Sequence, residues 1–211
     1  MTLRRRWLFA ISVALGLAAA ACSDPTAPLS TRDATALQAD VLADWGVPPC
    51  ILKQSSVAPP LETYQVGVWV RHDRESTVAV NYASGQPYLS LRIPRFGLKW
   101  APDGTRIQGS DSVLVTLILD PVNLSVSFQP SGLVFSDVFP AQLVMYYENA
   151  NPDLNGDGVV DFTDWVLKLQ LGIWGHSDRT PGWFRVGSRN NTSQQFVAGY
   201  IYHFSDYAVS W

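Results

Sequence analysis

The chain has 211 residues, and its 15 Lys and Arg against 18 Asp and Glu give a formal net charge of −3. Basic residues do not cluster beyond the first six positions, which argues against a nucleic-acid partner because phosphate recognition needs grouped Lys and Arg. The 3 His and 2 Cys are scattered along the sequence, so a zinc site is not expected.

The first 21 residues have the layout of an export signal. Arg4, Arg5 and Arg6 provide a positive start, and an apolar run follows from Trp7 to Ala21. At about 15 residues this run is shorter than the roughly 20 that a membrane-spanning helix needs. We therefore predict that residues 1–21 are a signal peptide that is cleaved during export.

Cys22 stands directly after three alanines. Residues 19–22 (Ala-Ala-Ala-Cys) resemble a lipobox, although Ala19 replaces the usual Leu, Val or Ile. The resemblance implies a lipid on Cys22, a cell-envelope protein anchored to a membrane, and a body that faces the periplasm or the exterior. A secreted protein cleaved at the same alanines is the alternative. If Cys22 carries lipid, Cys50 is expected to be a buried, inert thiol.

The next segment, residues 22–47, is predicted to be a tether. It begins with a polar stretch that contains proline and cannot build a core. A short helix is expected at 34–43, with Asp33 as its N-terminal cap.

Residues 48–211 are predicted to form one all-β domain. Short runs rich in Val, Ile, Leu and aromatic residues are separated by Gly, Pro, Asn and Asp, which is typical of an antiparallel β-sandwich. The expected strands are 64–70, 77–82, 88–93, 113–119, 124–128, 133–135, 142–147, 183–186, 196–204 and 207–211. One helix is expected, at 162–171, inside an insertion placed at 148–182.

The strongest chemical motif is an acidic loop at 153–164. Oxygen-bearing side chains recur at loop positions 1, 3, 5, 9 and 12, and Gly158 stands at position 6. This spacing curls oxygen ligands around one Ca²⁺, an ion that prefers six to eight of them. The predicted ligands are the side chains of Asp153, Asn155, Asp157, Asp161 and Asp164 and the backbone carbonyl of Val159. Calcium is the expected cofactor, and its expected role is structural.

The loop is followed by a predicted helix with Phe162, Trp165, Val166 and Leu169 on one apolar face. A loop followed by a helix resembles one repeat of a dockerin, a module that docks enzymes onto cohesins. Dockerins carry two repeats, and the sequence contains no second one. The resemblance thus implies calcium binding and a docking role, and it rests on a single repeat.

A second resemblance covers patches of residues 85–211. The runs at 130–135 (Pro-Ser-Gly-Leu-Val-Phe) and 140–143 (Pro-Ala-Gln-Leu) are similar to strands of ZU-five domains, the β-sandwiches of ankyrins and netrin receptors, and 91–94 (Leu-Arg-Ile-Pro) is similar to an earlier strand. Some ZU-five relatives cleave themselves at a His-Phe-Ser triplet. The resemblance implies that His203 activates the Ser205 hydroxyl to attack the Phe204 carbonyl.

Three functions are compatible with these features. The first is a non-catalytic, calcium-stabilised binding or scaffold protein with an unknown protein or glycan ligand. The second is a carbohydrate-binding or dockerin-like docking module, although Trp69, Trp100 and Trp183 are expected in the core rather than on a sugar platform. The third is a ZU-five-like switch that cleaves itself between Phe204 and Ser205. Hydrolysis of an external substrate has the least support.

Overall fold

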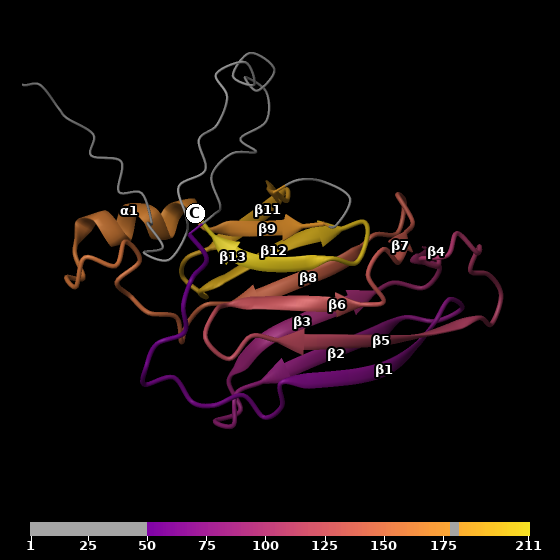
Figure 1. Ribbon diagram of the computed structural model, residues 1–211, viewed down its shortest axis with the longest axis horizontal. Helices are drawn as coiled ribbons and strands as arrows, with labels where there is room; N and C mark the ends of the chain where they lie inside the picture. Colours follow the sequence, from indigo (N-terminus) through magenta and orange to yellow (C-terminus); the bar gives the residue numbers. More distant parts are fainter. Residues whose placement is uncertain (1–49, 178–181) are drawn as a thin grey trace, which may run out of the picture.

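The computed structural model describes residues 50–177 and 182–211, which form two antiparallel sheets packed face to face (Figure 1). The predicted signal peptide, the lipidation site at Cys22 and the predicted helix at 34–43 lie outside the described residues. The predicted fold class is confirmed: the body is an all-β antiparallel sandwich with one short helix.

The larger sheet has six strands. In spatial order they are β1 (Gln65–Arg71), β5 (Ser112–Leu119), β6 (Ser125–Gln129), β13 (Asp206–Ser210), β9 (Gly172–His176) and β10 (Trp183–Arg185).

The smaller sheet has five strands and lies across the core from the first. In spatial order they are β11 (Ser188–Asn191), β12 (Phe196–Ile201), β8 (Ala141–Tyr146), β3 (Pro87–Ile93) and β2 (Ser76–Asn81). A separate pair joins β4 (Leu98–Trp100) to β7 (Val134–Phe135).

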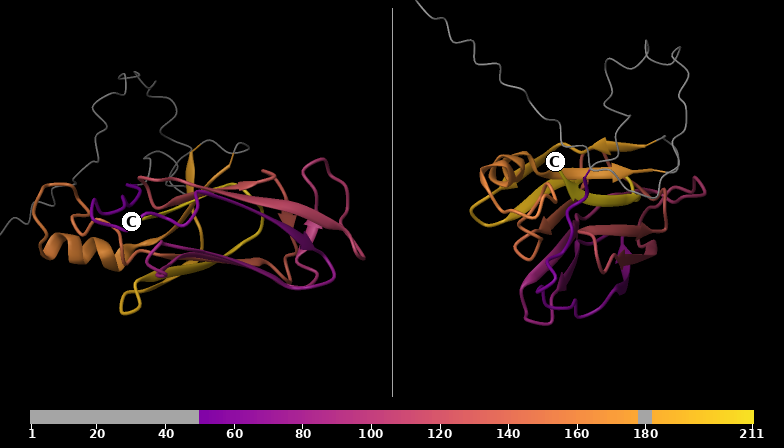
Figure 2. Two further views of the ribbon diagram at one scale, coloured as in Figure 1. Left: turned by 90° about the horizontal axis from the view of Figure 1, so that it is seen from below. Right: turned by 60° about the vertical axis from the view of Figure 1, so that its left-hand side comes forward.

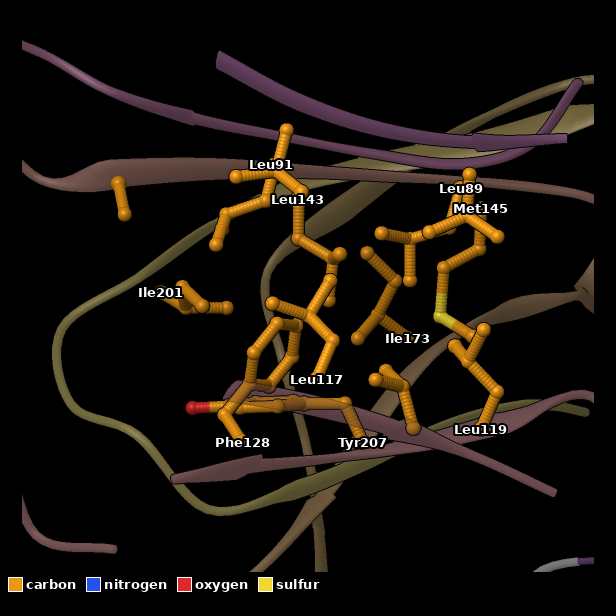
Figure 3. Packing of buried hydrophobic residues seen from close by; sticks show 14 of the residues in the cluster. Leu89, Leu91, Leu117, Leu119, Phe128, Leu143, Met145, Ile173, Ile201 and Tyr207 are labelled. Atoms are coloured by element: carbon orange, nitrogen blue, oxygen red, sulfur yellow. The ribbon is translucent and has the colours of Figure 1, made fainter. Parts of the chain in front are cut away.

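Alternating side chains of both sheets fill one continuous core (Figure 3). Leu143 and Met145 of β8 point into the core, and Phe128 of β6 enters the core from the opposite sheet. The ring of Phe128 stacks on Phe204 at 4.8 Å between centroids and meets Tyr207 edge-on at 5.9 Å. This alternation of buried and solvent-facing residues is what the sequence displays as a two-residue period.

The structure adds strands that the sequence did not predict, namely β4, β9 and β11. Strand β9 lies between β13 and β10 in the larger sheet, so residues 172–176 belong to the sandwich. The segment that stands outside the sandwich is therefore shorter than the insertion expected at 148–182. Strand β12 ends at Ile201 rather than continuing to residue 204.

Helix α1 (Phe162–Gln170) projects at one end of the sandwich (Figures 1 and 2). Its last carbonyl groups have no partners within a helix, so they need donors from elsewhere. The Asn190 side chain donates to the Lys168 carbonyl at 2.7 Å, and Arg185 donates to the Gln170 carbonyl at 2.7 Å. Strands β10 and β11 thus fix the C-terminal end of α1.

Candidate metal centre

The acidic loop is tied to the helix that follows it through Asp164. This residue is 3% exposed and is the only buried residue of α1. Its Oδ1 accepts hydrogen bonds from the backbone N–H of Leu154 at 2.7 Å and of Asn155 at 3.2 Å. Its Oδ2 accepts from the N–H of Asp161 at 2.8 Å. One carboxylate therefore joins the beginning of the loop to its end.

Asp161 caps the same helix. Its side chain accepts from the Thr163 N–H at 2.7 Å, while Asp164 returns a bond to the Asp161 N–H, and together they form a reciprocal capping box. Both predicted ligands thus also start the helix, which explains why the helix begins where the loop ends.

Asp153 closes the tip of the loop. Its Oδ1 accepts from Gly156 N–H at 2.8 Å and its Oδ2 from Gly158 N–H at 2.9 Å. Both glycines have positive φ, 74° at Gly156 and 88° at Gly158, a conformation that costs glycine least. Gly158, at loop position 6, thus permits the sharp turn of the chain.

Asn155 and Asp157 lie between these two anchors. The Asn155 amide donates to Asp157 Oδ2 at 2.8 Å, and the second carboxylate oxygen of Asp157 accepts from Val159 N–H at 2.8 Å. The structure thus brings the predicted residues of positions 1 to 7 into one compact turn, with Asp157 and Val159 on its solvent side.

Within residues 50–177 and 182–211, no three His, Cys, Asp or Glu side chains converge in a geometry that holds a metal ion as they stand. The donor set nevertheless fits Ca²⁺. A carboxylate has about four lone-pair positions, so Asp153, Asp157 and Asp164 can each keep their N–H partners and still bind an ion. Four aspartates within twelve residues also repel one another unless a cation lies among them.

The pKa of Asp164 is lowered from its ordinary value. Burial by itself raises the pKa of this carboxyl, but the hydrogen bonds from the backbone N–H groups of Asp161, Asn155 and Leu154 outweigh burial because they favour the charged form. Asp164 is therefore charged at neutral pH, as a calcium ligand must be.

The apolar face of α1 is largely turned to solvent. The predicted apolar face comprised Phe162, Trp165, Val166 and Leu169, and three of these residues, Phe162, Trp165 and Leu169, are 72%, 53% and 48% exposed. The helix cannot bury both faces, and the buried side is the one that carries Asp164. The exposed residues Phe162, Trp165 and Leu169, called here the α1 face, extend onto the loop through the exposed side chains of Val159 and Val160.

A groove of about 250 Å³ lies between the loop, α1 and the sandwich. Its apolar walls include Leu52, Leu154 and Leu171, with Trp165 at the side of the α1 face. The polar groups that line it are Tyr147, Glu148, Asn151, Asp161, Asp164, Lys168 and Gln195. The ammonium of Lys168 lies 5.6 Å from the centre of the Tyr147 ring, and burial raises the pKa of Tyr147 to about 12.

The expectation of a buried, inert thiol at Cys50 is wrong. Cys50 is half-buried, and its sulfur is disulfide-bonded. The chain has 2 cysteines, and Cys22 lies outside the described residues. A sulfur in a disulfide has no free valence for a thioether-linked lipid, so a disulfide within one chain and a lipid on Cys22 are mutually exclusive.

The intact mass of the mature protein is expected to reveal which of the two forms exists. If both cysteines form an intrachain disulfide, the chain is lighter than its reduced form by the two thiol hydrogens, and reduction restores them. A mass increase of a diacylglycerol group would instead establish the lipid anchor predicted from the lipobox resemblance. The Cys50→Ser variant, which cannot form the disulfide, is the matched control.

The residues of the His-Phe-Ser triplet lie close in sequence but do not make a catalytic pair in this conformation. Ser205 is buried, and its hydroxyl donates to the backbone carbonyl of His176. The His203 ring packs near the Phe184 ring, with 6.0 Å between centroids. The Phe204 carbonyl accepts from Gly132 N–H at 3.0 Å, and its ring is in the core. This geometry favours a structural role, and the mass measurement is expected to show an uncut chain.

The tryptophans expected in the core are not there. Trp69 is 66% exposed on β1, and Trp100 is 38% exposed on β4. Trp183 on β10 is partly exposed, and its ring lies 5.4 Å from that of His176. In the β1–β5 register, Trp69 stands opposite Leu114, which is also exposed. The outer face of the larger sheet thus presents an aromatic side chain to solvent.

No protein-family model, curated protein sequence or solved structure matches this chain. The resemblances to lipoboxes, dockerins and ZU-five domains therefore rest on the motifs alone and stay predictions. In the parts of the chain that the structure describes, no helix is long and apolar enough to cross a membrane.

Proposed function

We propose that the protein is an exported, non-catalytic binding module in which Ca²⁺ holds the acidic loop and α1 against a β-sandwich. The observation that carries the proposal is the position of Asp164. It is buried, charged and bonded to both ends of the loop. An ion bound among Asp153, Asp157 and Asp164 would lock the loop and α1 into one orientation.

Export supports this function in two ways. The N-terminal residues have the pattern of a signal peptide, and disulfides persist in oxidising compartments, where Cys50 would keep its bond. Extracellular calcium modules bind in the range of about 10⁻⁴ to 10⁻³ M, which suits the calcium outside a cell. A membrane anchor through lipid on Cys22 stays part of the proposal only if the intact mass contains the lipid.

Removal of calcium is expected to lower the melting temperature. An ion present at a hundred times its dissociation constant stabilises the folded state by about 2.7 kcal/mol, which corresponds to roughly 5–10 °C in a domain of this size. Differential scanning calorimetry with added Ca²⁺ and with excess chelator measures the difference.

The matched variants for that experiment are Asp157→Asn and Asp137→Asn. Both aspartates are exposed. Asp157 is a proposed ligand, so Asp157→Asn should lose most of the calcium-dependent rise in melting temperature. Asp137 lies outside the acidic loop and pairs with Lys99, so Asp137→Asn should keep that rise. Equal melting temperatures with Ca²⁺ and with chelator in the unmodified protein would contradict the proposal.

A second candidate function, glycan binding, is supported by the exposure of Trp69. Exposed indole rings stack on the apolar faces of sugars, and neighbouring amide or hydroxyl groups complete such sites. Near Trp69 on β1, Gly67 stands opposite Thr116, which pairs in turn with Gln129 of β6. A flat strip of this kind could accept an extended chain of sugars.

The Trp69→Ala variant is expected to weaken retention of the protein in affinity electrophoresis through soluble polysaccharides by at least about tenfold. This loss corresponds to roughly 1.4 kcal/mol, within the range for one aromatic contact. The Trp100→Ala variant, which removes an exposed tryptophan from a different strand pair, should be retained like the unmodified protein. If the unmodified protein is not retained by any polysaccharide tested, glycan binding at this face is wrong.

A further inference from the structure

The α1 face is an exposed apolar surface beside the candidate calcium site. The rings of Phe162 and Trp165 stack on each other at 5.4 Å between centroids, so they form one continuous surface. The groove adds buried leucine walls directly beside them. Contiguous apolar surface of this kind marks a docking site rather than a random scatter of exposed side chains.

The described chain begins at one end of this surface. The Ser210 hydroxyl donates to the Cys50 carbonyl at 2.7 Å, and Ser210 pairs with Gly172, two residues after the end of α1. Leu52, two residues further along the chain, already forms part of the groove wall. Figure 1 shows the start of the described chain next to the C-terminal end of α1. The described chain therefore begins beside the groove.

The sequence of the preceding segment is complementary to the groove. Leu37, Val41 and Trp45 recur every four residues, so a helix in this segment would carry them on one face. Twelve helical residues, 34–45, span about 18 Å, and the four residues between 45 and 50 can extend over about 13 Å. The segment is thus long enough to fold back along α1 from Cys50.

Chain continuity favours this segment over a second copy of the chain, because the described chain begins at Cys50 beside the groove. The groove carries Lys168 together with the carboxylates of Glu148, Asp161 and Asp164, so its charge does not select the occupant. Two copies that paired through their α1 faces would bring their acidic loops together, each with four aspartates, and the loops would repel.

We propose that residues 34–45 dock as a helix on the α1 face and the adjoining groove. The helix predicted in the tether supplies the partner that α1 does not find within the sandwich. The undocked part of the tether would then end near residue 33 rather than at Cys50.

Hydrogen–deuterium exchange of the mature chain, with saturating Ca²⁺, tests the proposal. Amides of residues 34–43 should exchange on the order of tenfold or more slowly than an unstructured peptide of the same sequence. The Leu37→Ser and Val41→Ser variants should lose this protection, and so should Trp165→Ser, which changes only the exposed docking surface. The Ala39→Ser and Ala43→Ser variants, on the opposite side of the predicted helix, should retain it.

Exchange at the rate of an unstructured peptide in the unmodified chain overturns the proposal. Protection that survives Trp165→Ser also overturns it, because the segment would then dock elsewhere. A dimer that forms with increasing concentration, detected by light scattering, and that dissociates in Trp165→Ser shows that a second copy covers the face instead. Calcium binding is measured separately by the chelation experiment, so failure of docking and failure of the calcium proposal are distinguishable.

Discussion

Replacement of Asp164 by alanine is expected to destabilise the protein by roughly 3 kcal/mol, because three backbone N–H groups lose their acceptor. The groups belong to Leu154, Asn155 and Asp161. Water cannot replace the carboxylate fully, since Asp164 is 3% exposed. Chemical denaturation in the presence of Ca²⁺ measures the loss.

Asp161→Ala is the matched control. Asp161 is exposed and accepts a single N–H, from Thr163, so its loss should cost about 1 kcal/mol. If Asp164→Ala is no more destabilising than Asp161→Ala, Asp164 does not hold the loop and α1 together.

The same residue predicts a pH dependence with a definite sign. The pKa of Asp164 is lower in the folded protein than the ordinary value of 3.8 that this carboxyl has in an unfolded chain. Its contribution to the free energy of unfolding is therefore complete above that value and is lost as the pH falls through the lower folded pKa. Between about pH 5 and pH 2, the unmodified protein should lose more stability than Asp164→Ala, which has no carboxylate to protonate there.

Most of the sandwich could be predicted because its strands keep a two-residue period. In β8 the buried residues Ala141, Leu143 and Met145 alternate with less buried neighbours, and the sequence shows this pattern directly. Strand β9 was missed since it is buried on both faces and contains two glycines, so the period disappears. Gly175 is required there, because a Cβ atom would stand 2.5 Å from the Phe184 ring.

The sequence predicts the residues of the acidic loop, and the structure brings them into one turn, but the sequence does not predict how the helix after the loop is oriented. The spacing of Asp153, Asp157 and Asp164 identifies the loop because ligand positions follow the chain locally. The direction of the helix depends on which of its two sides the sandwich accepts. Periodicity shows that Phe162 and Trp165 share a face, but it cannot show that the opposite face, with Asp164, is the one turned inward.

The polar edge strand β11 was also not predicted from the sequence. Strand β11 consists of Ser188, Arg189, Asn190 and Asn191, residues that favour turns, yet it pairs with β12 along its full length. Its role becomes clear only in three dimensions: Asn190 holds the Lys168 carbonyl and accepts the Tyr147 hydroxyl at 2.8 Å. Tertiary hydrogen bonds thus outweigh the low local strand propensity of this segment.

Replacement of Phe128 by alanine is expected to cost more than any single change in the loop, roughly 3–5 kcal/mol. Phe128 is fully buried and its ring contacts both Phe204 and Tyr207, so truncation leaves a cavity that neighbours from two sheets cannot fill. Urea denaturation of the unmodified protein and of Phe128→Ala provides the comparison.

The calcium dependence of that cost separates the two parts of the molecule. Phe128 lies in the core between the sheets, whereas the loop is fixed at their end through α1 (Figure 1). Because residues without shared partners contribute additively, the Phe128→Ala cost should be the same with Ca²⁺ and with chelator, whereas the Asp164→Ala cost should fall when the ion is absent. A Phe128→Ala cost that changes with Ca²⁺ would show that the ion stabilises the sandwich itself and not only the loop and α1.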